Sequence, residues 1–174
     1  MNKHEKKYYN NKMIFIKALE ALLQEKKLSE ISITKIITQT KLSRSTFYSH
    51  YNSIDELYND LLEYYYQEFN KFISSIENND ELTKVTLILE YFKKNSVFLK
   101  LMLENSNFNI LTKVIEKYKE FIYMKNDVFN SEEAYYISSY QFTGLVSLLI
   151  AWYKSNYSLS TTKLAKLIIK LVSI

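Results

Sequence analysis

Three residue types that shape many folds are absent or nearly absent from this chain of 174 residues. It contains no cysteine, no proline and one glycine, Gly144. Without cysteine it has no disulfide framework and no thiolate chemistry. Tight turns between β-strands depend on glycine and proline, so the composition argues against a β-sandwich or a β-barrel. We therefore predict an all-α protein.

Long hydrophobic runs are also missing. The longest apolar stretch, residues 144–153, is well short of the ~20 residues that cross a bilayer. The N-terminal stretch "MNKHEKKYYNNKMIF" carries charge but no apolar core of signal-peptide length. We expect a cytoplasmic protein without a membrane partner.

Signatures of catalysis are scarce as well. The chain has two histidines, no glycine-rich phosphate loop and no nucleophile elbow. The acidic pair Glu132 and Glu133 lies at a predicted helix start, where the helix dipole already accounts for it. We expect no enzyme, no metal site and no cofactor.

The chain does have helical periodicity and enough apolar residues to form a core. Hydrophobic residues make up 47% of it and aromatic residues 16%. Clusters rich in Asn and Ser separate about nine amphipathic segments, three in the basic N-terminal part and six longer ones after them. The predicted helices cover residues 9–26, 33–40, 44–50, 54–77, 79–95, 96–105, 107–126, 131–155 and 160–174.

Charge is distributed unevenly along the chain. Residues 1–51 contain ten basic and four acidic residues, whereas the remainder contains thirteen basic and fifteen acidic ones. A basic N-terminal third on a near-neutral body is typical of a nucleic-acid-binding domain with a second domain appended. A solvated basic face is the alternative explanation.

The second and third predicted helices have capped starts. Ser32 and Ser43 can each accept a hydrogen bond from a free backbone N–H in the first turn that follows. The fourth helix begins with Ser53 and Glu56 at the spacing of a capping box. Two short helices joined by a tight turn match the helix-turn-helix geometry, in which the second helix enters the major groove.

Helical spacing sorts the side chains of the third predicted helix. Phe47 and Tyr51 lie four residues apart and should face the core. Arg44 is the only arginine among 23 basic residues, and its guanidinium fork fits O6 and N7 of guanine. The alternative is that Arg44 caps or pairs locally. The outer side of this helix carries Arg44, Ser45, Tyr48 and Ser49, flanked by Thr46 and His50.

The stretch "ISITKIITQTKLSRSTFYSHYNSIDELYNDLL", residues 31–62, resembles the DNA-binding domain of TetR-family transcriptional regulators. The family pattern has a Thr/Ser-Val/Ile pair, an isoleucine three residues on and an Ala-Gly-Val turn. It continues with Ser-Arg-Gly-Thr-Phe-Tyr-x-His-Phe and an acidic helix start. Ser32-Ile33, Ile36, residues 43–51 and residues 55–57 match it, and the similarity covers roughly residues 9–65.

The resemblance implies which residues approach DNA. His50 matches a histidine that either contacts DNA or hydrogen-bonds to a neighbouring helix. Lys41 stands where glycine is usual, and a positive φ there would cost on the order of 1 kcal/mol relative to glycine. Ile54 stands where a phosphate-binding lysine is common. The implied DNA-contacting residues are Thr34, Lys35, Arg44, Ser45, Thr46, Tyr48, Ser49 and His50.

The resemblance also implies two domains. Residues 9–53 would form the helix-turn-helix domain, with its core extending into the next helix, and residues 54–174 a helical regulatory and dimerisation domain. The segments "EYFKKNSVFLKLML" and "GLVSLLIAWYKS" resemble a branch of the family found in low-GC Gram-positive bacteria.

The last two predicted helices are the expected dimer interface. The first carries a stripe of small residues and the second is amphipathic, so a pair from each subunit would form a four-helix bundle. The alternative is that these faces pack inside their own protomer. The predicted interface comprises Gly144, Ser147, Leu148, Ala151, Leu164, Leu167, Ile168 and Leu171.

Aromatic residues are frequent in the larger domain. They either line a pocket for a planar or amphipathic effector or pack as ordinary core. The candidates for such a pocket are Phe69, Tyr91, Phe98, Met102, Phe121 and Tyr140.

Two functional interpretations follow. In the first, a homodimeric repressor binds double-stranded DNA at a palindromic operator until a small-molecule effector releases it. In the second, a TetR-like co-regulator acts mainly through protein–protein contacts and binds DNA only with a partner. Arg44, Tyr48 and the basic N-terminal charge favour the first interpretation, whereas Ile54 and the turn without glycine favour the second.

Overall fold

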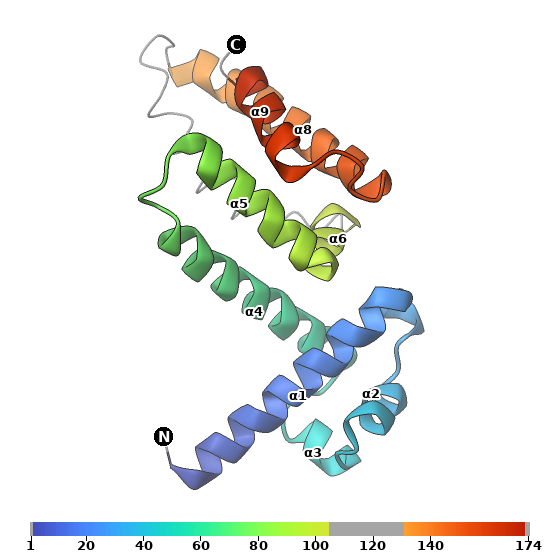
Figure 1. Ribbon diagram of the computed structural model, residues 1–174. Helices are drawn as coiled ribbons and strands as arrows, with labels where there is room; N and C mark the ends of the chain where they lie inside the picture. The colour runs from blue at the N-terminus through green and yellow to red at the C-terminus, as the bar shows by residue number, and fades with distance from the viewer. Residues whose placement is uncertain (1, 105–130, 173–174) are drawn as a thin grey trace. The chain divides into compact units, whose positions relative to one another are not determined.

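The computed structural model describes residues 2–104 and 131–172 (Figure 1). Within these ranges the chain forms eight α-helices, one short 3-10 helix and no strand, which confirms the all-α prediction. The helix predicted at 107–126 lies outside the described residues. The helices are α1 (Lys3–Glu25), η1 (Leu28–Glu30), α2 (Ile33–Thr40), α3 (Arg44–Tyr48), α4 (Ile54–Ser75), α5 (Glu81–Lys94), α6 (Ser96–Glu104), α8 (Ser131–Lys154) and α9 (Thr161–Val172).

The chain divides into two compact units, Met1–Asn70 and Lys71–Ile174. The division falls inside α4, whereas the sequence suggested a boundary at the start of that helix. Most of α4 therefore completes the core of the first unit. No helix in the described ranges has the length and apolarity needed to span a membrane.

In the first unit, α1 begins two turns earlier than its hydrophobic pattern predicts. Asn2 accepts a hydrogen bond from the Glu5 backbone N–H at 2.9 Å, and the Glu5 carboxylate accepts one from the Asn2 N–H at 2.8 Å. This capping box starts the helix at Lys3. Residues 3–10 are all exposed, so hydrophobic periodicity gives no signal for these turns.

A single hydrophobic core holds the first unit together. α1 contributes a stripe of buried residues at helical spacing, and α2, α3 and α4 each contribute residues against it. α1 contacts α2, and α2 contacts α3, in the arrangement expected of a helix-turn-helix (Figure 1). The fully buried side chains of this core are Phe15, Ile16, Leu19, Leu23, Ile36, Phe47, Leu57 and Leu61.

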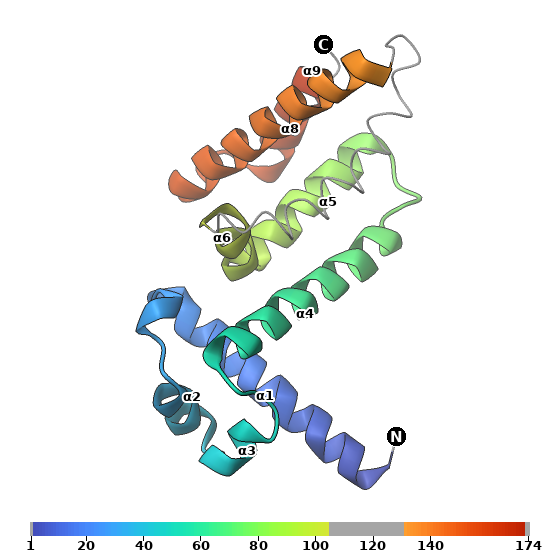
Figure 2. The same ribbon diagram turned by 180° about the vertical axis from the view of Figure 1, so that it is seen from behind.

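The second unit is built around α5. Asp80 caps α5 by accepting a hydrogen bond from the Thr83 N–H at 3.0 Å. α5 packs against α6 and α9, and α6 packs against α8 (Figure 2). At the corner between α8 and α9, Asn156 and Tyr157 have φ values of 53° and 58°. The Trp152 indole N–H donates to the Leu159 carbonyl at 2.7 Å and closes this corner.

Candidate nucleic-acid interface

The two caps predicted for the helix-turn-helix are present. The Ser32 hydroxyl accepts a hydrogen bond from the Lys35 N–H at 3.3 Å, and the Ser43 hydroxyl accepts one from the Thr46 N–H at 3.0 Å. Between them, Lys41 has a φ of 57°, in the left-handed region that favours glycine. Lys41 therefore adopts, without being glycine, the left-handed conformation that glycine adopts most easily.

α3 presents the two faces that its sequence predicts. Phe47 is fully buried, and Tyr51, just beyond the helix, is 6% exposed. The helix is shorter than predicted because it ends at Tyr48 instead of His50. The residues expected on its outer side, Arg44, Ser45, Tyr48 and Ser49, are all exposed.

Hydroxyl groups organise the start of α3. The Ser43 hydroxyl lies 2.8 Å from the hydroxyls of both Ser45 and Thr46. The Ser49 hydroxyl donates to the Thr46 carbonyl at 2.8 Å, which leaves its oxygen free to accept from a base amino group. These contacts orient the hydroxyls of Ser45, Thr46 and Ser49.

The Arg44 guanidinium projects from the first position of α3 into solvent. In the part of the chain that the structure describes, no carboxylate lies within ion-pair distance of it. The alternative of a local ion pair thus has no partner here. All its donors are available for a base or a phosphate.

The start of α2 offers two further exposed groups, Thr34 and Lys35. The Lys35 ammonium donates to the Glu30 carbonyl at 2.6 Å, which leaves two of its three protons for a phosphate. Ile54, at the start of α4, is half-buried and has no polar group to offer.

The start of α4 differs in detail from the predicted capping box. The Glu56 N–H does donate to the Ser53 hydroxyl at 3.1 Å. The Glu56 carboxylate, however, accepts from the Asn52 backbone N–H at 2.7 Å and from the Asn52 side chain at 3.0 Å. These hydrogen bonds lower the pKa of Glu56. The reciprocal contact therefore reaches one residue further back than the sequence pattern suggested.

His50 packs against α1. Its ring stacks on Tyr8, with centroids 3.9 Å apart and an angle of 28° between the planes, and it meets the edge of Phe15 at 5.7 Å. Its Nδ1 is buried and has no hydrogen-bond partner among the described residues. Burial, and then the charge of Lys12, lower the pKa of His50, while Asp60 partly opposes them. In the described part of the chain, His50 therefore contacts α1 through its ring, whereas the sequence left open either a hydrogen bond to a neighbouring helix or a contact with DNA.

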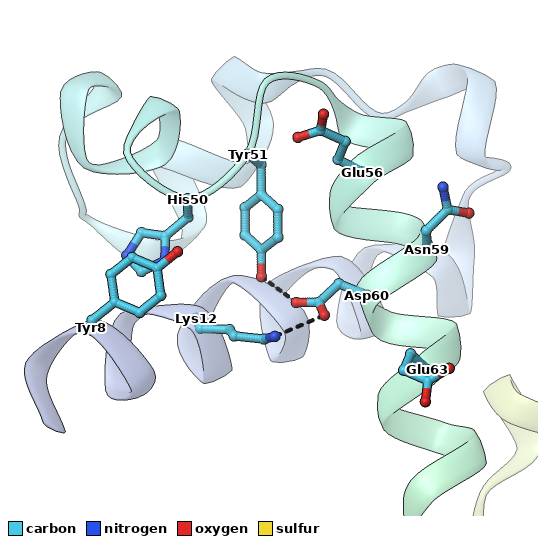
Figure 3. Close-up of a pocket in the computed structure, with 8 residues that line it drawn as sticks. All are labelled: Tyr8, Lys12, His50, Tyr51, Glu56, Asn59, Asp60 and Glu63. Atoms are coloured by element: carbon cyan, nitrogen blue, oxygen red, sulfur yellow. Dashed lines mark hydrogen bonds and ion pairs between the residues drawn. The ribbon is translucent and has the colours of Figure 1, made fainter. Parts of the chain in front are cut away.

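Beside His50 lies an open cleft of about 410 Å³ between α1, the α3–α4 connection and α4 (Figure 3). Asp60 occupies its centre. One carboxylate oxygen pairs with the Lys12 ammonium at 2.8 Å and the other accepts from the Tyr51 hydroxyl at 2.7 Å. Burial and these contacts with Asp60 raise the pKa of Tyr51. No spacing in the sequence links the members of this cluster, because they come from three separate elements.

Comparison with known proteins decides the family. Residues 79–173, more than half of the chain, match the TetR family model described as "Transcriptional regulator C-terminal region". The chain belongs to the TetR family of transcriptional regulators. This membership places it among regulators of transcription and not among enzymes.

Individual relatives of this TetR-family chain are distant. The HTH-type dhaKLM operon transcriptional activator DhaS of Lactococcus lactis is 28% identical over 124 residues, which cover 63% of each chain. A TetR transcriptional regulator from Streptococcus agalactiae has the same fold, with a TM-score of 0.74, 20% identity and 97% of each chain covered. The structure of the dihydroxyacetone kinase operon activator DhaS aligns with a TM-score of 0.57, 24% identity and 93% of each chain covered.

Of the residues predicted to line an effector pocket, Tyr91, Phe98, Met102 and Tyr140 belong to the second unit. Phe98 and Met102 are buried on α6, and the Tyr91 ring meets that of Phe98 at 6.5 Å. Phe69 is buried in the first unit. Tyr140, on α8, is 79% exposed. Phe121 lies outside the described residues.

The predicted dimer residues fall into two groups. Leu164 and Ile168 are buried inside the protomer, on α9, which packs against α5. Leu148 is half-buried. The remaining predicted residues are exposed on α8 and α9: Gly144, Ser147, Ala151, Leu167 and Leu171.

Proposed function

We propose that this TetR-family regulator is a homodimer that reads a palindromic operator by inserting α3 of each copy into the major groove. The observation that carries the proposal is the outer face of α3, where an unpaired Arg44 is exposed beside a fixed set of hydroxyls. A guanidinium presented in this way suits guanine, whose O6 and N7 accept its two parallel donors.

The exposed stripe on α8 supports the dimer. Gly144, Ser147 and Ala151 share one face of the helix and are exposed in the protomer. Small side chains allow a second helix to approach closely, and Leu167 and Leu171 of α9 add exposed apolar surface. A dimer places two reading helices on two half-sites, which raises both affinity and selectivity.

The direction of control has two candidates. A repressor released by a small-molecule effector is the function that the sequence suggested. Activation is the second candidate, because DhaS, the relative of 28% identity, is named a transcriptional activator. Transcription from the regulator's own promoter, measured in vitro with and without the purified protein, separates the two roles. A repressor should lower the amount of transcript, and an activator should raise it. In either role the protein acts on the chromosome, in agreement with the expected cytoplasmic location.

Fluorescence anisotropy tests the DNA reading directly. The DNA would come from upstream of the protein's own gene, with a scrambled duplex as the competitor and several salt concentrations. Arg44→Ala should weaken binding by about 1–3 kcal/mol per half-site, and only where a guanine is read. Lys166→Ala, which removes the same charge from exposed α9, is the matched control and should bind like the wild type.

Two other outcomes would reject the proposal. Equal weakening by Arg44→Ala on every sequence would mean that Arg44 contacts phosphate. Weak wild-type binding that salt abolishes equally on both duplexes would favour the co-regulator that needs a partner to bind DNA.

A further inference from the structure

Three elements of the first unit meet at one carboxylate. Asp60, on α4, binds the Lys12 ammonium of α1 with Oδ1 and the Tyr51 hydroxyl with Oδ2, at 2.8 and 2.7 Å (Figure 3). Tyr51 follows the end of α3, and its backbone N–H donates to the Phe47 carbonyl at 2.9 Å. The hydrogen bond between the Tyr51 hydroxyl and Asp60 therefore holds the residue whose backbone is bonded to the end of α3.

The length of α3 makes this contact important. A helix of five residues has too few internal hydrogen bonds to hold its own position, so its surroundings must hold it. Its apolar contacts, such as the edge-to-face pair of Phe15 and Phe47 at 5.4 Å, attract it without fixing a direction. A hydrogen bond to a charged group is directional and stronger than a neutral one. Asp60 supplies that direction at the end of α3.

Stability alone is a weak explanation of the cluster. The side chains of Lys12 and Asp60 are 36% and 23% exposed, and ion pairs in such positions contribute little to the free energy of unfolding. In contrast, a small displacement at the end of α3 would move every side chain on its outer face. The ion pair thus contributes more to the orientation of α3 than to the free energy of unfolding.

We propose that Asp60 is a positioning residue for DNA reading, which sets the orientation of α3 through Tyr51 and Lys12. The inference rests on the proposed function, because it assumes that α3 reads DNA. The family pattern that this stretch resembles has phenylalanine at the place of Tyr51, and phenylalanine has no hydroxyl to donate to Asp60.

The test measures three variants: Asp60→Asn, Tyr51→Phe and the double variant that carries both substitutions. Asp55→Asn is a separate control variant. Asp55 lies on the same helix, is exposed and, within the described ranges, forms no hydrogen bond or ion pair with Lys12, Tyr51 or Asp60, so it is the charge control. Removing a negative charge from a DNA-binding unit should by itself strengthen binding to the polyanion. Asp60→Asn should nevertheless weaken operator binding about five- to tenfold, while binding to scrambled DNA stays equal or becomes tighter.

The Tyr51→Phe variant removes one hydroxyl and keeps the buried ring, so its fold is secure. We expect operator binding to weaken about threefold. The double variant should bind no more weakly than Asp60→Asn alone, because the hydroxyl then has no carboxylate to lose. Such non-additivity distinguishes a shared contact from two independent defects.

Each remaining outcome rejects the inference. If Asp60→Asn binds the operator as tightly as Asp55→Asn, the carboxylate does not position α3. If Tyr51→Phe binds like the wild type, or if the two substitutions add, the proposed route through Tyr51 is wrong. A wild-type protein that does not distinguish operator from scrambled DNA rejects the proposed function as well, whereas a selective wild type with unchanged variants rejects this inference alone.

Discussion

Replacing Lys41 by glycine should stabilise the turn between α2 and α3. Lys41 has a φ of 57°, and an L-residue in that region is strained by about 1–2 kcal/mol, whereas glycine adopts it freely. The one backbone contact of this residue, its N–H to the Ile37 carbonyl at 2.9 Å, survives the change. Glycine also raises the conformational entropy of the unfolded chain, which offsets about 0.4–1 kcal/mol of the gain. The net effect should be a stabilisation of about 0.5–1 kcal/mol, or roughly 1–4 °C in Tm.

Thermal and urea unfolding followed by circular dichroism would measure this difference. Lys27→Gly is the matched control, because Lys27 is also exposed and loses the same charge but has a φ of −78°. Without strain to relieve, the control should lower stability by about 0.4–1 kcal/mol. If both variants lose stability equally, the left-handed turn is not strained and the reasoning fails.

Two further predictions concern the charge of His50 and the dimer. Because burial and the charge of Lys12 lower the pKa of His50, the folded state binds its proton less tightly than the unfolded chain, and His50 should lower stability as the pH falls through about 6.5. In an NMR titration, Lys12→Met should raise the pKa of His50 and Asp60→Asn should lower it further; unchanged values would contradict the assigned causes. Ala151→Arg should shift sedimentation from dimer towards monomer, whereas Thr162→Arg on α9 should not; a wild-type monomer at micromolar concentration would reject the proposed interface.

Local signals in the sequence were sufficient for most of the helix-turn-helix. Ser32 and Ser43 predict the helix starts because a capping hydroxyl acts within three residues of its own position. Phe47 and Tyr51 predict the buried face because helical spacing alone places them together. The positive φ of Lys41 could be anticipated from the family pattern, since the geometry of the turn requires it whatever residue stands there.

Features that depend on tertiary contacts could not be predicted from local sequence patterns. The first turns of α1 bury nothing, so periodicity placed the helix start too late, although Asn2 and Glu5 have the spacing of a cap. Asp60 lies nine residues from Tyr51 and on a different helix from Lys12, and no sequence spacing links the three. The exposure of Tyr140 likewise follows from how α8 is oriented, which an aromatic count cannot reveal.

The contacts on either side of α3 explain how five residues can serve as a reading element. At its start, Ser43 caps the helix and ties the hydroxyls of Ser45 and Thr46. Just beyond its end, Tyr51 is held by Asp60, and the ring of His50 is stacked on α1. Ordering these groups in the free protein removes an entropic cost that binding would otherwise carry. Selectivity should therefore depend on Asp60 and Tyr51 as well as on the residues that face DNA, and loosening either end of α3 should reduce operator binding more than non-specific binding.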